Sequence, residues 1–311
     1  MRWLALLALA ALVLSCSGWD DDQRYVPYTR WVYVQDSLGL HRYDPRSTGS
    51  PPETLGPCTA FDLQGDDLWC LSSGQLEWRD ARSGALHWAI PVDPAAHLVC
   101  VGERLVAVAA GQQLLLRNRQ QPDRLLATLD LEARATAAHA VGGQVAVGTA
   151  TGRLLLIDER ARVPRADLAL PAAAHTMATD RNHRLRVQLV PEAAGGWREA
   201  VVDIGGGVVV GQVQEPELRH RFYSPLVRSL YEREWLAEVD WRRDSLLGRW
   251  PSVGRVEGVG VDFFMGVAWC WQGGQLRPLD LHTGKTGTGG TWPAKPIQIR
   301  FWVEQRGRSR P

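Results

Sequence analysis

Short apolar runs, each bounded by Gly, Asp, Pro or Ser, follow one another along most of the chain. Residues 74–80 predict a strand, Asp80 and Gly84 mark the ends of a turn, and residues 85–88 begin the next strand. No long segment beyond residue 29 has the 3.6-residue period of a helix. The pattern therefore predicts an all-β fold made of many short strands and tight turns.

The strand-and-turn unit repeats at a nearly constant distance. Residues 274–284 repeat residues 74–84 closely, and residues 113–118 and 152–158 are shorter copies. Seven turn residues recur at intervals of 36 to 45 positions, namely Asp44, Asp80, Asn118, Asp158, Asp203, Asp244 and Asp280. Four short strands in about 40 residues is the blade period of β-propellers. We therefore expect residues 30–311 to form a β-propeller of about seven four-stranded blades, with six or eight as alternatives and residues 296–303 as a candidate closing strand.

The pattern Gly-Gln-Leu-x-x-x-Asp-x-x-Ser/Thr-Gly at residues 74–84 and 274–284 resembles the quinoprotein-type propeller repeat. Its Asp accepts hydrogen bonds from nearby backbone N–H groups and its Gly takes a positive φ, so the turn would link the two outer strands of a blade. The resemblance covers residues 30–303 and is weakest between Asp180 and Pro251. Many members of this class bind no quinone. The quinone enzymes carry adjacent cysteines against the cofactor, and this sequence has no such pair, so we expect no cofactor.

The N-terminus predicts export and lipid anchoring. Residues 1–15 combine Arg2 with an apolar run that is too short to span a bilayer, as in a cleaved signal peptide. The residues before Cys16 resemble the lipobox of bacterial lipoproteins, which implies that Cys16 carries the lipid, and several acyl chains on one cysteine anchor a protein stably. An ordinary secretory signal is the alternative. Residues 16–29 are polar and predict a tether. By the same resemblance, Ser17 in place of aspartate implies the outer membrane, facing the periplasm.

The tripeptide Ala-Ala-His occurs three times, ending at His97, His139 and His175, each before the first strand of a predicted blade. The first strand of a blade lines the central channel, so three imidazoles could gather near one mouth and bind a transition metal or an anion. The alternative is that duplication copied a blade-entry tripeptide whose histidine caps a strand or packs between blades. Without an evident carboxylate partner, the three histidines fall short of a catalytic set.

Four cysteines remain beyond Cys16. Cys70 and Cys270 each lie four residues before a repeat glycine, which places them on equivalent strands of different blades. Cys58 and Cys70 flank one predicted hairpin and could form a disulfide, with buried free thiols as the alternative. No CxxC spacing supports a zinc site.

Charge and composition exclude several functions. The chain has 35 Lys and Arg residues and 34 Asp and Glu residues, which gives a net charge of +1. It therefore has no strong overall positive charge that would attract nucleic acid. No Gly-x-Ser-x-Gly, HExxH or GxGxxG motif is present, and several of the 14 tryptophans fall at repeat positions where they would pack between blades.

These observations favour a cell-envelope lipoprotein whose propeller acts as a protein-interaction or assembly scaffold. Its expected partners are the membrane, through the anchor, and an envelope protein. The alternative is a ligand- or metal-binding protein or an enzyme with its site at the channel mouth. Enzyme activity is the less favoured reading, because no reactive group has a convincing partner.

Overall fold

The computed structural model describes residues 29–44, 51–179, 183–190, 197–214, 220–223, 227–230, 235–240, 245–251, 258–262, 267–280, 285–287, 289–292 and 294–303. The predicted signal peptide at residues 1–15 and the lipidation residue Cys16 lie outside these ranges. Within the described part of the chain, no helix has the length and apolar character needed to cross a membrane.

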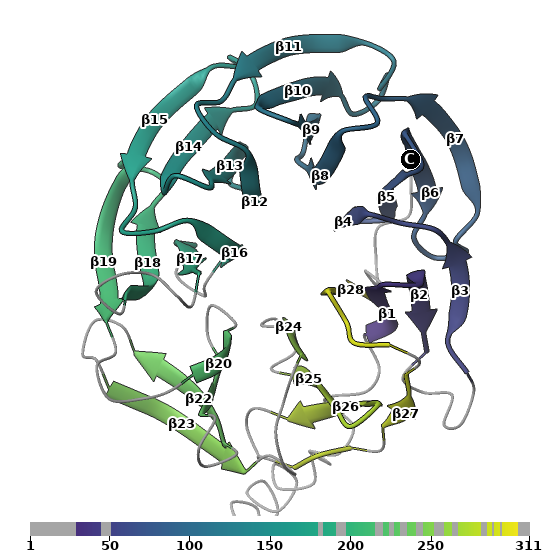
Figure 1. Ribbon diagram of the computed structural model, residues 1–311, viewed down its shortest axis with the longest axis vertical. Coiled ribbons are helices and arrows are strands. Elements are labelled where there is room, and N and C mark those ends of the chain that lie inside the picture. Colours follow the sequence, from purple (N-terminus) through teal and green to yellow (C-terminus); the bar gives the residue numbers. More distant parts are fainter. Residues whose placement is uncertain are drawn as a thin grey trace, which may run out of the picture.

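The described strands form seven four-stranded antiparallel sheets, which are arranged radially as the blades of a propeller (Figure 1). The predicted all-β fold and the predicted number of blades are confirmed. The blades are, in order, β28 (Gln298–Val303), β1 (Thr29–Asp36), β2 (Gly39–Tyr43) and β3 (Glu53–Gly56); β4 (Ala60–Gln64), β5 (Asp67–Ser72), β6 (Gln75–Asp80) and β7 (Leu86–Pro91); β8 (Ala96–Val101), β9 (Leu105–Ala110), β10 (Gln113–Asn118) and β11 (Leu125–Asp130); β12 (Ala135–Val141), β13 (Gln144–Thr149), β14 (Arg153–Asp158) and β15 (Pro164–Ala169); β16 (Ala174–Thr179), β17 (Leu185–Leu189), β18 (Trp197–Asp203) and β19 (Val208–Gln214); β20 (His220–Tyr223), β21 (Val227–Leu230), β22 (Trp235–Asp240) and β23 (Ser245–Pro251); β24 (Gly258–Asp262), β25 (Val267–Gln272), β26 (Gln275–Asp280) and β27 (Gly290–Thr291).

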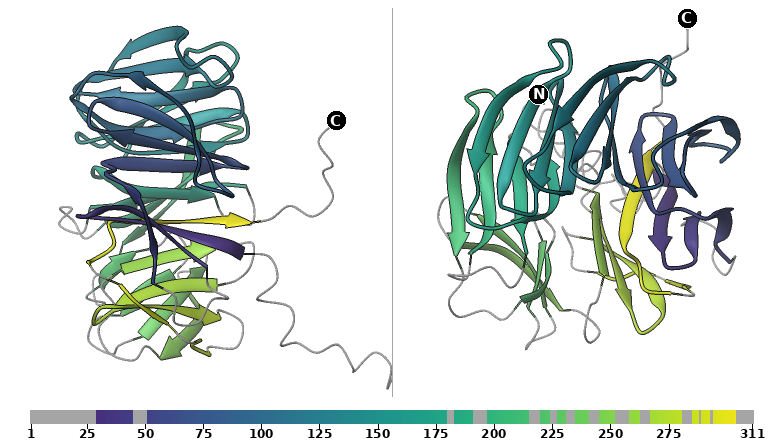
Figure 2. Two further views of the ribbon diagram at one scale, coloured as in Figure 1. Left: turned by 90° about the vertical axis from the view of Figure 1, so that its right-hand side faces the viewer. Right: turned by 45° about the horizontal axis from the view of Figure 1, so that its top comes forward.

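The ring closes by pairing the last described strand with the first. β28 runs antiparallel to β1, with Ile299 opposite Val34 and Gln298 opposite Gln35. The two strands lie side by side in yellow and purple in Figure 2. In blade one the C-terminal strand therefore takes the inner position that the first strand of the segment holds in the other blades. The predicted closing strand at residues 296–303 is confirmed, with observed bounds of 298–303.

The repeated turn joins the third and fourth strands of a blade, as predicted. In blade two the Asp80 carboxylate accepts hydrogen bonds from the backbone N–H of Ser83 at 2.6 Å and from its hydroxyl at 2.7 Å. Gly84 has a φ of 76°, and its N–H donates to the Asp80 carbonyl oxygen over 2.8 Å. The third strands of blades three, four, five and seven likewise end at Asn118, Asp158, Asp203 and Asp280.

Blade six departs from the predicted turn positions. Its third strand β22 ends at Asp240, so this residue holds the place that the sequence pattern assigned to Asp244, which lies outside the described residues. The fourth strand, β23, begins at Ser245, opposite Asp240. The repeat is weak in this stretch, and the sequence pattern selected Asp244 instead of Asp240, which lies four positions earlier.

The hydrophobic core is divided into layers between neighbouring blades. Between blades two and three, the fully buried Trp69 stacks on Trp78 with ring centroids 6.0 Å apart, and its ring meets Trp88 edge to face at 5.3 Å. The three indoles share this layer with valines of blade three, such as Val106 and Val108. These tryptophans therefore pack between blades, as their repeat positions predicted.

Polar side chains also connect blade two to blade three and blade three to blade four. Arg119 of blade three donates to the Asp67 carboxylate of blade two over 2.6 Å. Glu159 of blade four is buried, and its carboxylate accepts the backbone N–H groups of Glu103 and Arg104 at 3.2 and 2.7 Å. Blade-to-blade contacts in this half of the ring thus combine apolar layers with buried hydrogen bonds.

Candidate functional site

The three predicted histidines lie on the first strands of blades three, four and five, but their positions are not equivalent. Each of these strands has a register shift that skips one residue near its start: His97 in β8, Thr136 in β12 and His175 in β16. These three residues are therefore structural equivalents, and His139 lies three positions further along β12. The prediction that the three histidines are equivalent was wrong, because in blade four the Ala-Ala-His tripeptide lies inside the strand rather than at its beginning.

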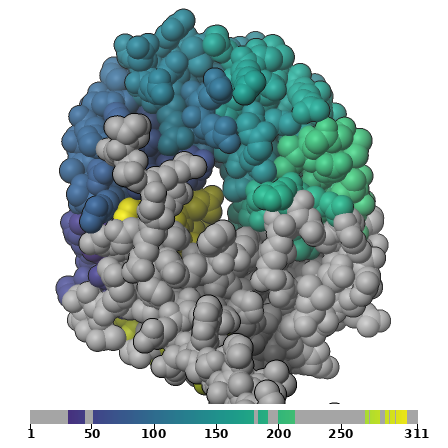
Figure 3. Space-filling view, turned by 180° about the vertical axis from the view of Figure 1, so that it is seen from behind, coloured from purple at the N-terminus to yellow at the C-terminus, as the bar shows by residue number. Residues whose placement is uncertain are grey.

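One cavity of about 340 Å³ lies at the centre of the ring. His97, Thr136 and His175 line it, together with Thr59 of blade two and Ile297 of blade one. His139 is not among its lining residues. Figure 3 shows a gap near the centre of the molecule, bordered on its upper side by described residues in blue and teal. The structure thus brings two of the three predicted histidines to a shared space and leaves the third outside it.

His97 makes a contact between blades. Its Nε2 lies 3.0 Å from the carbonyl oxygen of Ala135 in blade four, and its Nδ1 lies 3.2 Å from the carbonyl oxygen of Ala95. Carbonyl oxygens only accept hydrogen bonds, so the ring acts as a donor here. This is the packing role that the sequence left open as the alternative to a binding site.

His139 has a different environment from the other two. Its Nε2 lies 2.9 Å from the hydroxyl oxygen of Thr179 in blade five. Burial, and to a smaller extent the nearby positive charge of Arg300, lower the pKa of His139 from 6.5 to about 4. The ring is therefore neutral at pH 7 and serves as a hydrogen-bonding contact between blades four and five.

The structure does not bring His97, His139 and His175 together into one cluster. Among the described residues, which include all three, no group of three or more His, Cys, Asp or Glu side chains is placed to hold a metal ion. The three histidines do not converge because His139 lies three positions further along its strand, where it contacts Thr179 of blade five. A transition metal needs several convergent ligands, and this arrangement does not supply them.

An ion pair next to the cavity was not found from the sequence. The Arg300 guanidinium in β28 lies 3.6 Å from the Asp62 carboxylate in β4. The same carboxylate accepts the backbone N–H groups of Val101 at 2.8 Å and Leu63 at 2.9 Å. Burial raises the pKa of Asp62, while Arg300 and these N–H groups oppose the rise. Ring closure alone brings Arg300 beside Asp62, so no local sequence signal could reveal the pair.

The polar groups around the cavity are mostly engaged in holding blades together. Gln35 Nε2 donates to the carbonyl oxygen of Thr59 at 2.8 Å, and Gln298 Nε2 donates to that of Phe61 at 3.0 Å. Cys100 is fully buried, and burial followed by the charge of Asp62 raises its pKa well above 9.0. A protonated thiol is a poor nucleophile. The described lining therefore supports a structural role for this region better than a catalytic one.

Cys58 and Cys70 are free, buried thiols in the structure rather than a disulfide. Both belong to one core cluster, and the Cys58 thiol donates to the carbonyl oxygen of Ala60 over 3.2 Å. A hydrogen bond with the Cys58 thiol, together with burial, raises the pKa of Cys70 well above 9.0. The structure therefore agrees with the second possibility, buried free thiols. Cys70 and Cys270 occupy the same position in β5 and β25, as predicted.

Comparisons with known proteins support the fold. No protein-family model and no curated protein matches the chain. Among solved structures, a chain of the "Crystal Structure of Mitotic Checkpoint Complex" is similar with a TM-score of 0.60 at 11% identity, covering 81% of this chain and 90% of that one. "Dihydro-heme d1 dehydrogenase NirN in complex with DHE" has a TM-score of 0.60 at 12% identity, covering 88% and 75%. At these identities the likeness establishes the β-propeller architecture alone.

Proposed function

We propose that this chain is a lipid-anchored protein of the cell envelope whose propeller serves as a protein-interaction scaffold. The fold fits such a role, because propellers present short outer strand edges and loops to partners. Anchoring through Cys16, the outer-membrane location and the envelope partner rest on the N-terminal sequence. We also propose that the repeats are of the quinoprotein type, a class that includes a lipoprotein of an envelope assembly machinery.

The observation that carries the scaffold proposal is a row of apolar side chains on the outer rim. β7, β11, β15 and β19 each form one edge of their sheet. At or beside the start of each lies an exposed apolar side chain, and we call this set the rim residues: Leu86, 49% exposed; Leu125, 48%; Val163, 52%; and Val208, 48%. A strand edge with apolar side chains is a ready site for an added strand or a protein surface.

The channel-mouth alternative is less well supported. His97 and the glutamines at the centre are hydrogen-bonded between blades, and the described residues contain no cluster of three or more potential metal ligands. Metal analysis of the protein made without an affinity tag separates the two functions. A stoichiometric metal that disappears when His97, His139 and His175 are replaced together would favour the alternative.

The scaffold proposal is tested by cross-linking and recovery from native membranes. Wild-type protein should recover a defined envelope protein, and the triple variant Leu86→Asp, Leu125→Asp, Val208→Asp should recover at least tenfold less of it. Leu38→Asp is the matched control, because Leu38 is 61% exposed but lies in the turn between β1 and β2. Equal recovery by the triple variant would remove the rim from the proposal.

The anchor is tested separately. Growth with labelled palmitate should label the wild type and leave Cys16→Ala unlabelled. If neither protein is labelled, the lipid anchor is wrong, and the scaffold proposal would then concern a secreted protein.

A further inference from the structure

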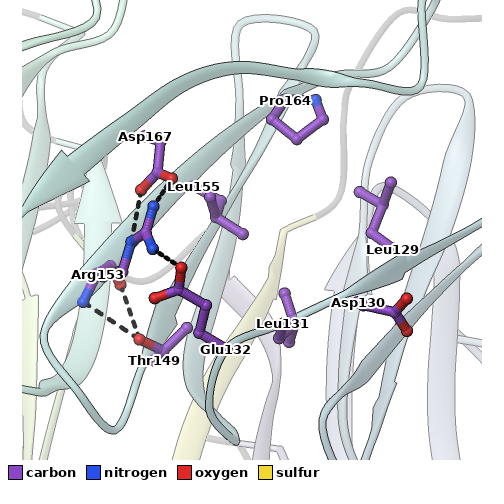
Figure 4. A pocket seen from close by; sticks show the side chains of 9 residues that line it. All are labelled: Leu129, Asp130, Leu131, Glu132, Thr149, Arg153, Leu155, Pro164 and Asp167. Carbon is purple, nitrogen blue, oxygen red and sulfur yellow. Dashed lines mark hydrogen bonds and ion pairs between the residues drawn. The ribbon is translucent and has the colours of Figure 1, made fainter.

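A groove lies on the rim between blades three and four, away from the channel. It has a volume of about 220 Å³, and its apolar part consists of Leu129, Leu131, Leu155 and Pro164 (Figure 4). Leu129 and Leu155 belong to the margin of the hydrophobic layer between these blades. The groove is therefore the outer end of an inter-blade core layer that no described residue covers.

Carboxylates dominate the charge of the groove. Asp130, Glu132 and Asp167 line it together with a single cation, Arg153. Arg153 forms ion pairs with both Glu132 and Asp167, and Figure 4 shows its guanidinium between them. Glu132 is nevertheless 68% exposed, and Asp130 is exposed with one hydrogen bond, from Gln113 at 3.3 Å. Three carboxylates against one guanidinium leave negative charge available to a cationic ligand.

The layer behind the groove holds smaller side chains than the layer between blades two and three. In that second layer, Trp78 and Trp88 lie opposite each other on β6 and β7 and pack against its core residues. In blade three the residues in the same register are Leu116 and Ala127. The layer between blades three and four thus holds a leucine and an alanine where the preceding layer holds two indoles, and the groove lies at its outer end.

We propose that this groove binds an extended segment of a partner protein in which arginine or lysine alternates with apolar side chains. This inference rests on the proposed scaffold function and names the partner chemistry at one site. The apolar side chains of such a segment would lie on Leu129, Leu155 and Pro164, and its cations would meet the carboxylates at the rim. An anionic ligand is disfavoured, since like charges meet across the groove.

The free outer edges of β11 and β15 beside the groove suit an extended chain. β11 pairs with β10 and β15 pairs with β14, and each is the last strand of its sheet. In both, exposed positions alternate with half-buried ones over most of the strand. Strand addition supplies main-chain hydrogen bonds, while alternate side chains supply specificity.

The direct test measures binding of a labelled eight-residue peptide of alternating valine and arginine by fluorescence anisotropy with the full mature chain. Its twin with glutamate in place of arginine is the ligand control. Glu132→Lys should weaken binding of the arginine peptide about tenfold, and Glu103→Lys, an equally charge-reversing change at an exposed residue outside the groove, should leave it unchanged. Equal affinity for the two peptides, or no effect of Glu132→Lys, would overturn the proposal.

A second variant tests shape without changing charge. Leu129→Trp enlarges a side chain that lines the groove and should fill it, reducing peptide affinity at least tenfold. Circular dichroism and the urea midpoint report whether the variant keeps the native fold. If it folds and binds the peptide like the wild type, the ligand does not occupy this groove.

The results for the groove and for the scaffold can be told apart. If wild-type protein recovers an envelope partner through the rim residues while the peptide does not bind, the groove proposal fails and the scaffold proposal stands. If the peptide binds in the groove but no envelope protein is recovered, the site exists and the scaffold proposal fails. Competition of the peptide with a recovered partner would join the two.

Discussion

His139 should make the stability of the fold depend on pH. Burial and the charge of Arg300 lower the pKa of its ring to about 4, whereas the ring titrates near 6.5 in the unfolded chain. The folded state therefore disfavours the protonated ring. Its stability is intact above about pH 6.5 and falls as the pH drops from 6.5 toward 4. With 1.36 kcal/mol for each pKa unit, the loss between pH 7.5 and pH 5.0 is about 2 kcal/mol.

The assay is urea unfolding of the wild type and of His139→Gln at pH 7.5 and 5.0. Glutamine is neutral at both pH values and can still hydrogen-bond to the Thr179 hydroxyl. Other titrating groups are common to both proteins, so their contributions cancel in the difference. We expect the wild type to lose about 2 kcal/mol more of its free energy of unfolding than the variant does over this interval.

Thr179→Val is the control that separates burial from the hydrogen bond. It removes the hydrogen-bond partner at 2.9 Å but leaves the ring between the blades. Because burial is the main cause of the lowered pKa, this variant should keep most of the wild-type pH dependence. If the wild type and His139→Gln lose the same stability on acidification, the buried neutral imidazole is the wrong explanation.

Three further outcomes follow from the contacts between blades. Arg300→Met should lower the free energy of unfolding by about 2–3 kcal/mol, because it leaves the Asp62 carboxylate without its cation, and adding Asp62→Asn should restore much of that loss in a double-mutant cycle. Trp69→Ala should cost about 3–5 kcal/mol by thermal or urea unfolding, whereas Leu86→Ala on the rim should cost less than about 1 kcal/mol. A thiol reagent added to native, reduced, mature protein should leave the four described cysteines largely unlabelled until urea unfolds the chain, because all four are buried; rapid labelling of folded protein would contradict their burial.

Much of the fold could be predicted from the sequence because its signal is local. An Asp-to-Gly turn such as residues 80–84 is fixed by hydrogen bonds within five residues, so the local sequence is enough to recognise it. The same locality explains the error in blade six, where Asp240 rather than Asp244 ends the strand. Only the pairing of β22 with β23 shows which of the two aspartates in this weak repeat ends the third strand.

The candidate site was harder to predict because it depends on register and on distant pairing. One skipped residue near the start of β12 makes Thr136, and not His139, the equivalent of His97. A shift of this kind leaves no mark in the tripeptide itself. Arg300 and Asp62 are 238 positions apart in the chain, and only the closed ring places them together. The groove at the rim is lined by residues of two blades, such as Leu129 and Leu155, and only the packing of blade three against blade four brings them together.

The pairing of β1 with β28 has a consequence for how the protein matures. Blade one cannot be completed until the final strand has left the ribosome, so the edge of β1 stays uncovered until synthesis ends. Any truncation before Gln298 would leave that edge permanently open to other chains. The same geometry makes the starting point of the polypeptide arbitrary: a rearranged gene that joins the two ends and begins between blades two and three should yield the same ring.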